Sequence, residues 1–137
     1  MASNPRSSPE NERCRQWLYE LKVRGANVFL PEISDYEIRR ELLRAHKTAG
    51  LARLDSLRSI LNFLPINSLA MERAAMLWAE ARNRGRPTAH SEALDGDAIL
   101  AAQALTAGFP PEDVVVATAN LGHLGQFVQA ALWADIE

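Results

Sequence analysis

Two carboxylates, Asp95 and Asp97, stand just before the small apolar run 98–104. Mg²⁺ and Mn²⁺ prefer oxygen ligands, and Mg²⁺ commonly uses only one or two carboxylates and keeps several waters. Acids crowded at the start of a packed helix therefore indicate a site for a hard divalent cation. A structural alternative stays open, because an Asp at such a position also caps a helix or complements the positive end of its dipole.

Short apolar runs alternate with helical patterns along the chain and predict the elements that position these acids. Strands are predicted at 27–31, 63–66, 114–118 and 131–133. Helices are predicted from Pro9 to Gly25, from Ser34 to Gly50, over 51–61, from Asn67 or Ser68 to Gly85, and from just after Asp97 to Gly108. This alternation is typical of a parallel sheet with helices on both faces.

Polar side chains follow the predicted strands. Glu37 and Asn120 each come shortly after a strand, and Asp95 and Asp97 precede the helix that leads into the strand before Asn120. Ligands of open α/β sheets collect at the carboxyl ends of the strands. We therefore expect oxygens of Glu37, Asp97 and Asn120 to converge on one cation, as metal-assisted phosphodiester hydrolysis requires.

Each of these residues also has a purely structural interpretation. Glu37 stands three residues after Ser34, so a capping box explains it as well, and Asn120 is as easily a helix cap. Trp78 recurs at helical spacing and is predicted to pack in the core. The sequence has no Gly-rich phosphate loop, serine nucleophile elbow or dinucleotide fingerprint, which counts against nucleotide-cofactor enzymes and serine hydrolases.

The composition is that of one ordinary globular domain. The chain has 137 residues, of which 47% are hydrophobic and 23% charged. A single cysteine, Cys14, excludes an internal disulfide framework and a Cys-based zinc cluster. No apolar run is long enough to span a bilayer, and the start has no signal-peptide pattern. We expect a cytoplasmic protein without a membrane segment.

The net charge of −2 is divided unevenly along the chain. Fifteen basic and ten acidic residues lie at or before Arg86, a net charge of +5, whereas seven acids and no Lys or Arg follow from Pro87. A basic part can meet phosphates and an acidic part can gather cations. Because the chain as a whole is not basic, strong non-specific nucleic-acid binding is not expected, and transient contact with RNA stays open.

Three segments, 28–42, 94–104 and 115–124, resemble PIN-domain nucleases of the bacterial toxin–antitoxin type. Their order and spacing cover nearly the whole chain, and the middle segment is fairly specific. The resemblance implies a single domain over residues 1–137 with a three-layer α/β/α sandwich around a short central parallel sheet. It also implies a Mg²⁺- or Mn²⁺-dependent endoribonuclease that hydrolyses RNA, and a homodimer often held inactive by a small antitoxin protein.

The resemblance also assigns roles by position. Glu37 matches the second acid of the family's site and Asp97 the third, so both would ligate the metal. Asn120 falls at the fourth position, where many members have Asp, and would orient water or a second ion. Asp95 and Thr118 would be auxiliary polar residues of the site.

The sequence departs from the family pattern in two places. In the family, a strand ending in an Asp precedes a helix like the one expected at Pro9, but only eight residues come before Pro9 and none is Asp. His90 and Ser91 also stand where related sequences often carry another acid.

Two accounts of the short N-terminus follow. Either the start is assigned too late and the native protein has the strand, or this is a catalytically weakened interaction module that binds an antitoxin-like partner. We prefer the first, because losing a central strand would leave its neighbours without hydrogen-bond partners. A small α/β protein of unrelated function, in which every acid is a cap, is a third reading.

Overall fold

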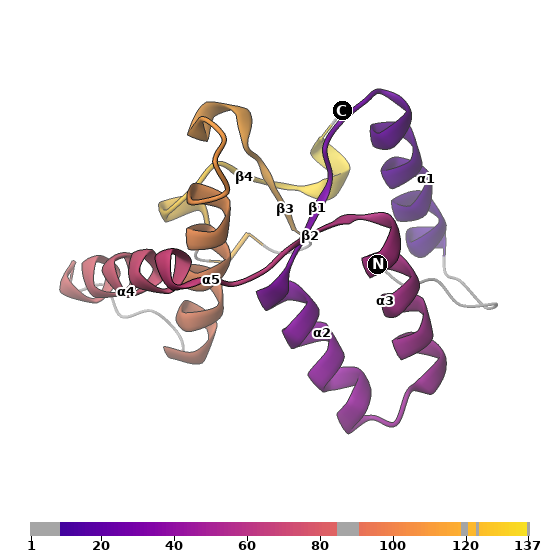
Figure 1. Ribbon diagram of the computed structural model, residues 1–137, viewed down its shortest axis with the longest axis horizontal. Helices are drawn as coiled ribbons and strands as arrows, with labels where there is room; N and C mark the ends of the chain where they lie inside the picture. Colours follow the sequence, from indigo (N-terminus) through magenta and orange to yellow (C-terminus); the bar gives the residue numbers. More distant parts are fainter. Residues whose placement is uncertain (1–8, 85–90, 119–120, 123, 137) are drawn as a thin grey trace. The chain divides into compact units, whose positions relative to one another are not determined.

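The computed structural model describes residues 9–84, 91–118, 121–122 and 124–136 (Figure 1). The chain divides into two compact units, of which the first ends at Leu64 and the second runs from Pro65 to Ile136. Each unit combines helices with a parallel pair of strands. The mixed α/β class with parallel strands is therefore confirmed. Within the described ranges, no helix is long and apolar enough to cross a lipid bilayer.

The first unit places a short parallel sheet among helices. Its elements are α1 (Pro9–Val23), β1 (Phe29–Pro31), α2 (Glu32–Arg44), α3 (Thr48–Ile60) and β2 (Asn62–Leu64). Leu30 of β1 lies opposite Phe63 of β2, and Leu30, Ile33 and Leu54 are buried. Both strands fall within or overlap the predicted apolar runs, and Pro31 ends β1 because proline lacks the N–H that would continue the ladder.

The end of α1 follows the sequence prediction. Gly25 donates its backbone N–H to the Lys22 carbonyl at 3.0 Å, and Ala26 donates to the Leu21 carbonyl at 3.0 Å. Gly25 has φ +84°, a left-handed conformation that glycine adopts without a Cβ clash. Gly25 is thus the residue at which the chain leaves the helix.

Gly50 was predicted to end a helix, and this prediction is wrong. The helix α2 already ends at Arg44, and Gly50 is buried inside α3. A Cβ atom built at Gly50 would lie 2.7 Å from Leu42 Cδ2, which is too close for two carbon atoms. The glycine therefore serves the close approach of α3 to Leu42 of α2, a need that arises from packing between helices.

The second unit contains two long helices, two strands and three short 3₁₀ turns among its described residues. The helices and strands are α4 (Ser68–Asn83), α5 (Ser91–Leu105), β3 (Val116–Thr118) and β4 (Ala130–Leu132). The 3₁₀ turns are η1 (Pro111–Asp113), η2 (Leu124–Gln126) and η3 (Trp133–Asp135). Val116 lies opposite Ala130 in the parallel register. All four predicted strands of the chain are therefore present, each with three residues.

Small side chains dominate the contact between α4 and α5, which cross in Figure 1. The buried cluster consists of Ala74, Leu77, Ala98, Ala101 and Ala102. Ile99, Leu105, Phe127 and Val128 pack against it. Because alanine side chains are short, the two backbones can approach closely, and this apolar contact holds the helix α5 in place.

Asn67 is the N-cap of α4. Its side-chain Oδ1 accepts a hydrogen bond from the Ala70 N–H at 2.8 Å, and its backbone is extended. An asparagine in this position satisfies one of the N–H groups that the first turn leaves without an acceptor. Of the two caps that the sequence allowed, the structure uses Asn67 and places Ser68 in the helix.

Trp78 was predicted to lie in the core, and this prediction is wrong. Its side chain is exposed, with the guanidinium of Arg82 at 5.3 Å from the ring centroid. The buried stripe of α4 runs instead through Ala74, Leu77 and Ala81. Trp78 follows directly after Leu77, so it lies about 100° away from that residue around the helix.

Candidate functional site

Glu37 lies in the second turn of α2, and its side chain is half-buried. The capping box expected from Ser34 does not form, because α2 begins at Glu32 with Pro31 as its N-cap and no side chain caps it. The start of the helix is set by Pro31, whose extended backbone separates β1 from α2. Helix capping therefore does not explain Glu37.

Asp95 and Asp97 are the fifth and seventh residues of α5, which begins at Ser91. The predicted start of this helix after Asp97 is therefore wrong, and neither acid is an N-cap. Residues two apart on an α-helix point about 200° away from each other. Accordingly, Asp95 is exposed and Asp97 is half-buried next to the buried Ala98. The two carboxylates face different ways, and Asp97 is the one that faces the body of the unit.

Thr118 is the last residue of β3 and lies opposite Leu132 of β4. Its side chain is half-buried. This puts a hydroxyl at the carboxyl end of a parallel strand, where ligands collect in α/β proteins. Asn120 lies outside the described residues, so its part in the site stays a prediction.

The predicted site residues come from both units. Glu37 belongs to the first unit, and Asp95, Asp97 and Thr118 belong to the second. Within the residues that the structure describes, no three His, Cys, Asp or Glu side chains gather as a metal-binding group. The convergence of Glu37 with Asp97 and Asn120 therefore stays a prediction. Their carboxylate and amide oxygens are in kind the donors that suit Mg²⁺ or Mn²⁺.

Asp35 is a buried acid that no local motif marked as important. It is 4% exposed, and Arg39 donates hydrogen bonds to both of its carboxylate oxygens. Arg39 also donates to Asp55 of α3, so the ion pairs tie α3 to the helix that carries Glu37. The spacing of Asp35 and Arg39 by four residues was a visible signal, whereas nothing local pointed to Asp55.

The PIN domain family matches residues 3–122 of the chain. The chain belongs to the PIN-domain family. The match spans both units and includes Glu37, Asp95, Asp97, Thr118 and Asn120. It confirms the resemblance at the level of the family.

PIN domains are generally nucleases and typically use divalent metals, so this PIN domain has a nuclease-type fold. No curated protein matches it.

Proposed function

We propose that this PIN domain is a Mg²⁺- or Mn²⁺-dependent endoribonuclease of the bacterial toxin type. The observation that carries the proposal is the position of Asp97. It is half-buried, it lies inside a helix packed against an apolar core, and it is not the N-cap of that helix. The family match includes it. A carboxylate in such a place is well positioned to act as a fixed ligand.

The proposed roles follow from the side-chain chemistry. Asp97 and Glu37 bind the cation, and Asn120 orients a water or a second ion. Thr118 offers a hydroxyl at the end of β3, and Asp95 contributes its negative charge from the exposed side of α5. A bound divalent ion supplies polarisation of the phosphoryl oxygen and stabilisation of the leaving oxygen.

The proposal includes partners and organisation. Because the family match crosses both units, we propose that residues 1–137 form one domain. Its substrate is RNA of the cytoplasm, its inhibitor is a small antitoxin protein, and it pairs with a second copy of itself. The competing candidate is a catalytically weakened PIN module that only binds a protein partner.

Two aspartates of α5 provide a matched test. The full chain, Asp97→Asn and Asp95→Asn are compared in Mn²⁺ titration calorimetry and in cleavage of labelled RNA, with a chelator as the metal-free control. Each variant removes one negative charge, and the two positions are two residues apart on the same helix. We expect Asp97→Asn to abolish metal-dependent cleavage and weaken Mn²⁺ binding strongly, and Asp95→Asn to weaken both only in part, because Asp95 contributes charge and not a direct ligand.

The outcomes separate the candidates. Full cleavage by Asp97→Asn removes this aspartate from the site. A wild-type chain that neither binds Mn²⁺ at millimolar concentrations nor cleaves RNA supports the interaction module instead. Circular dichroism of each variant shows whether a lost activity reflects a lost fold.

A further inference from the structure

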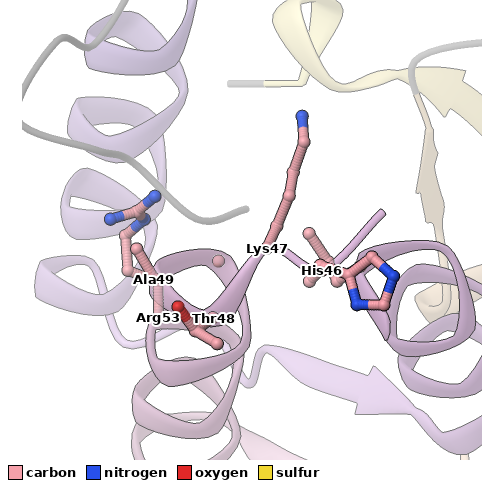
Figure 2. Close-up of a pocket in the computed structure, with 7 residues that line it drawn as sticks. His46, Lys47, Thr48, Ala49 and Arg53 are labelled. Atoms are coloured by element: carbon pink, nitrogen blue, oxygen red, sulfur yellow. The ribbon is translucent and has the colours of Figure 1, made fainter. Parts of the chain in front are cut away.

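A hollow of about 500 Å³ lies at the turn between α2 and α3 (Figure 2). Its lining residues are Leu42, His46, Lys47, Thr48, Ala49, Gly50 and Arg53. The lining contains a lysine, an arginine and a histidine and no acid, and the whole stretch 42–54 contains no Asp or Glu. The hollow is thus a positively charged concavity within the first unit.

Backbone donors open into the same turn. Lys47 is the N-cap of α3, and its side chain makes no capping hydrogen bond. The Leu51 N–H donates to the Lys47 carbonyl at 3.1 Å, so the amides of Thr48, Ala49 and Gly50 come before the first bond of the helix. Such amides have no acceptor within the helix and carry the positive end of its dipole. Phosphate oxygens bind to groups of this kind.

Arg53 adds an independent observation. Its Nε is buried and has no hydrogen-bond partner among the described residues. A buried donor without an acceptor is costly, and because solvent does not reach the Nε, a ligand in the hollow would meet Arg53 through the terminal Nη atoms of its guanidinium. Arg53 stands one helical turn after Ala49, and in Figure 2 the Lys47 side chain extends between those of Arg53 and His46.

We propose that this hollow binds phosphates of the RNA backbone, an assignment that rests on the ribonuclease function proposed above. Arginine, lysine and helix N-terminal amides are the groups that contact phosphates without reading sequence. Figure 2 shows the cationic side chains spread around the turn rather than directed at one point. This arrangement fits successive phosphates of a strand. A free phosphate ion offers the same chemistry, so the test distinguishes the two sources.

The test measures RNA binding without cleavage. A labelled single-stranded RNA is titrated with the full chain in the presence of a chelator, at several salt concentrations. The variants are Lys47→Gln, Arg53→Gln and the control Arg44→Gln. Arg44 lies three residues before Lys47, is outside the hollow, and already donates its Nε hydrogen to Glu41 at 2.7 Å. Each variant removes one positive charge.

We expect Lys47→Gln and Arg53→Gln each to weaken RNA binding about tenfold or more, the effect of one lost hydrogen bond to a charged group. The salt dependence should fall by about one counterion per lost contact. Arg44→Gln should stay within about twofold of the wild type. Equal losses in all three variants would overturn the proposal, because they would reflect net charge alone. Circular dichroism of Arg53→Gln excludes a folding defect.

A second arm follows inorganic phosphate by ³¹P line broadening. If Lys47→Gln loses phosphate binding but keeps its RNA affinity, the hollow takes free phosphate and the RNA assignment is overturned. The proposed function fails separately, through the absence of Mn²⁺-dependent cleavage. If the wild-type chain cleaves RNA but Lys47→Gln and Arg44→Gln bind RNA with equal affinity, the hollow is not a phosphate site. The proposed ribonuclease function would then still hold.

Discussion

Arg39 holds the buried carboxylate of Asp35 through two hydrogen bonds, of 3.1 Å from Nε and 3.0 Å from Nη2. Its Nη2 also lies 2.8 Å from Asp55. The Arg58 guanidinium approaches Asp35 at 3.9 Å and stacks over the ring of Phe63. The hydrogen bonds to Asp35 and Asp55 raise the pKa of Arg39, which keeps the guanidinium charged. Through Arg39 and Arg58, the Asp35 carboxylate thereby links α2 with α3. Arg58 extends these contacts to Phe63 of β2.

We predict that Arg39→Gln destabilises the protein. The Asp35 side chain is 6% exposed, and without the guanidinium of Arg39 its remaining cation among the described residues is the more distant Arg58. Breaking a partly buried pair from one side leaves a poorly compensated charge, so the free energy of unfolding should fall by about 2 kcal/mol. Urea unfolding followed by circular dichroism measures this.

The neighbouring Arg40 is the control for that prediction. It is exposed and lies over the ring of Tyr36, 5.1 Å from the centroid. Arg40→Gln removes the same charge without touching Asp35, so its urea midpoint should match that of the wild type. Equal destabilisation by both variants would show that the charge matters and that the buried pair does not.

We predict that Asn67→Ala weakens the start of α4. The substitution removes the acceptor of the Ala70 N–H, and the loss of an asparagine cap costs about 1 kcal/mol. Ser68→Ala is the matched control, because Ser68 is the first residue of the helix and not its cap. Thermal unfolding should show a lower midpoint for Asn67→Ala alone. A lower unfolding midpoint for Ser68→Ala than for Asn67→Ala would instead assign the cap to Ser68.

We predict that His46→Gly stabilises the protein. His46 has φ +56° in a helix end where its N–H bonds to the Leu43 carbonyl and the Lys47 N–H to the Leu42 carbonyl. Glycine is the usual residue in this left-handed position, so the gain should be about 1 kcal/mol. Ala45→Gly, at an ordinary negative φ, should not be stabilising.

The same variant also bears on the RNA contact. His46→Gly removes an imidazole from the hollow between α2 and α3, so RNA affinity should fall while the unfolding midpoint rises. A partly unfolded variant cannot produce that combination. An unchanged affinity would exclude the histidine from the contact.

We predict that the pKa of Glu41 lies below its ordinary value of 4.5, because Arg44 hydrogen-bonds to the carboxylate and adds its positive charge. A lowered folded-state pKa means that the pair stabilises the protein above the unfolded pKa and loses this contribution as the pH falls through the folded pKa. A carboxyl-carbon NMR titration should show the Glu41 pKa rising in Arg44→Gln. An unchanged titration would mean that the pair does not form in solution.

The strands and the family were predictable from short-range patterns. Val116 and Thr118 are β-branched and Ala117 is apolar, a composition that favours a strand. Gly25 ended its helix because an achiral residue was needed there for its backbone angle. Signals of this kind depend only on neighbouring residues, so the sequence shows them directly.

The boundaries of the acid-bearing helices were not predictable in the same way. Ser34 and Asp97 are residues that favour helix caps, yet both lie within helices that begin earlier, at Glu32 and Ser91. Gly50 was misassigned because its small size serves contact with Leu42. Packing between helices decided the position of Gly50, which short-range sequence patterns do not show, whereas α2 begins after the extended Pro31.

The alanine-rich contact between α4 and α5 has a consequence for how the protein tolerates change. Ala98, Ala101 and Ala102 are at most 1% exposed, and a methyl group leaves almost nothing to truncate. Apart from glycine, every substitution there adds bulk, which forces the helices apart. Variation at these positions would thus displace the backbone that bears Asp97, even where no polar atom is altered.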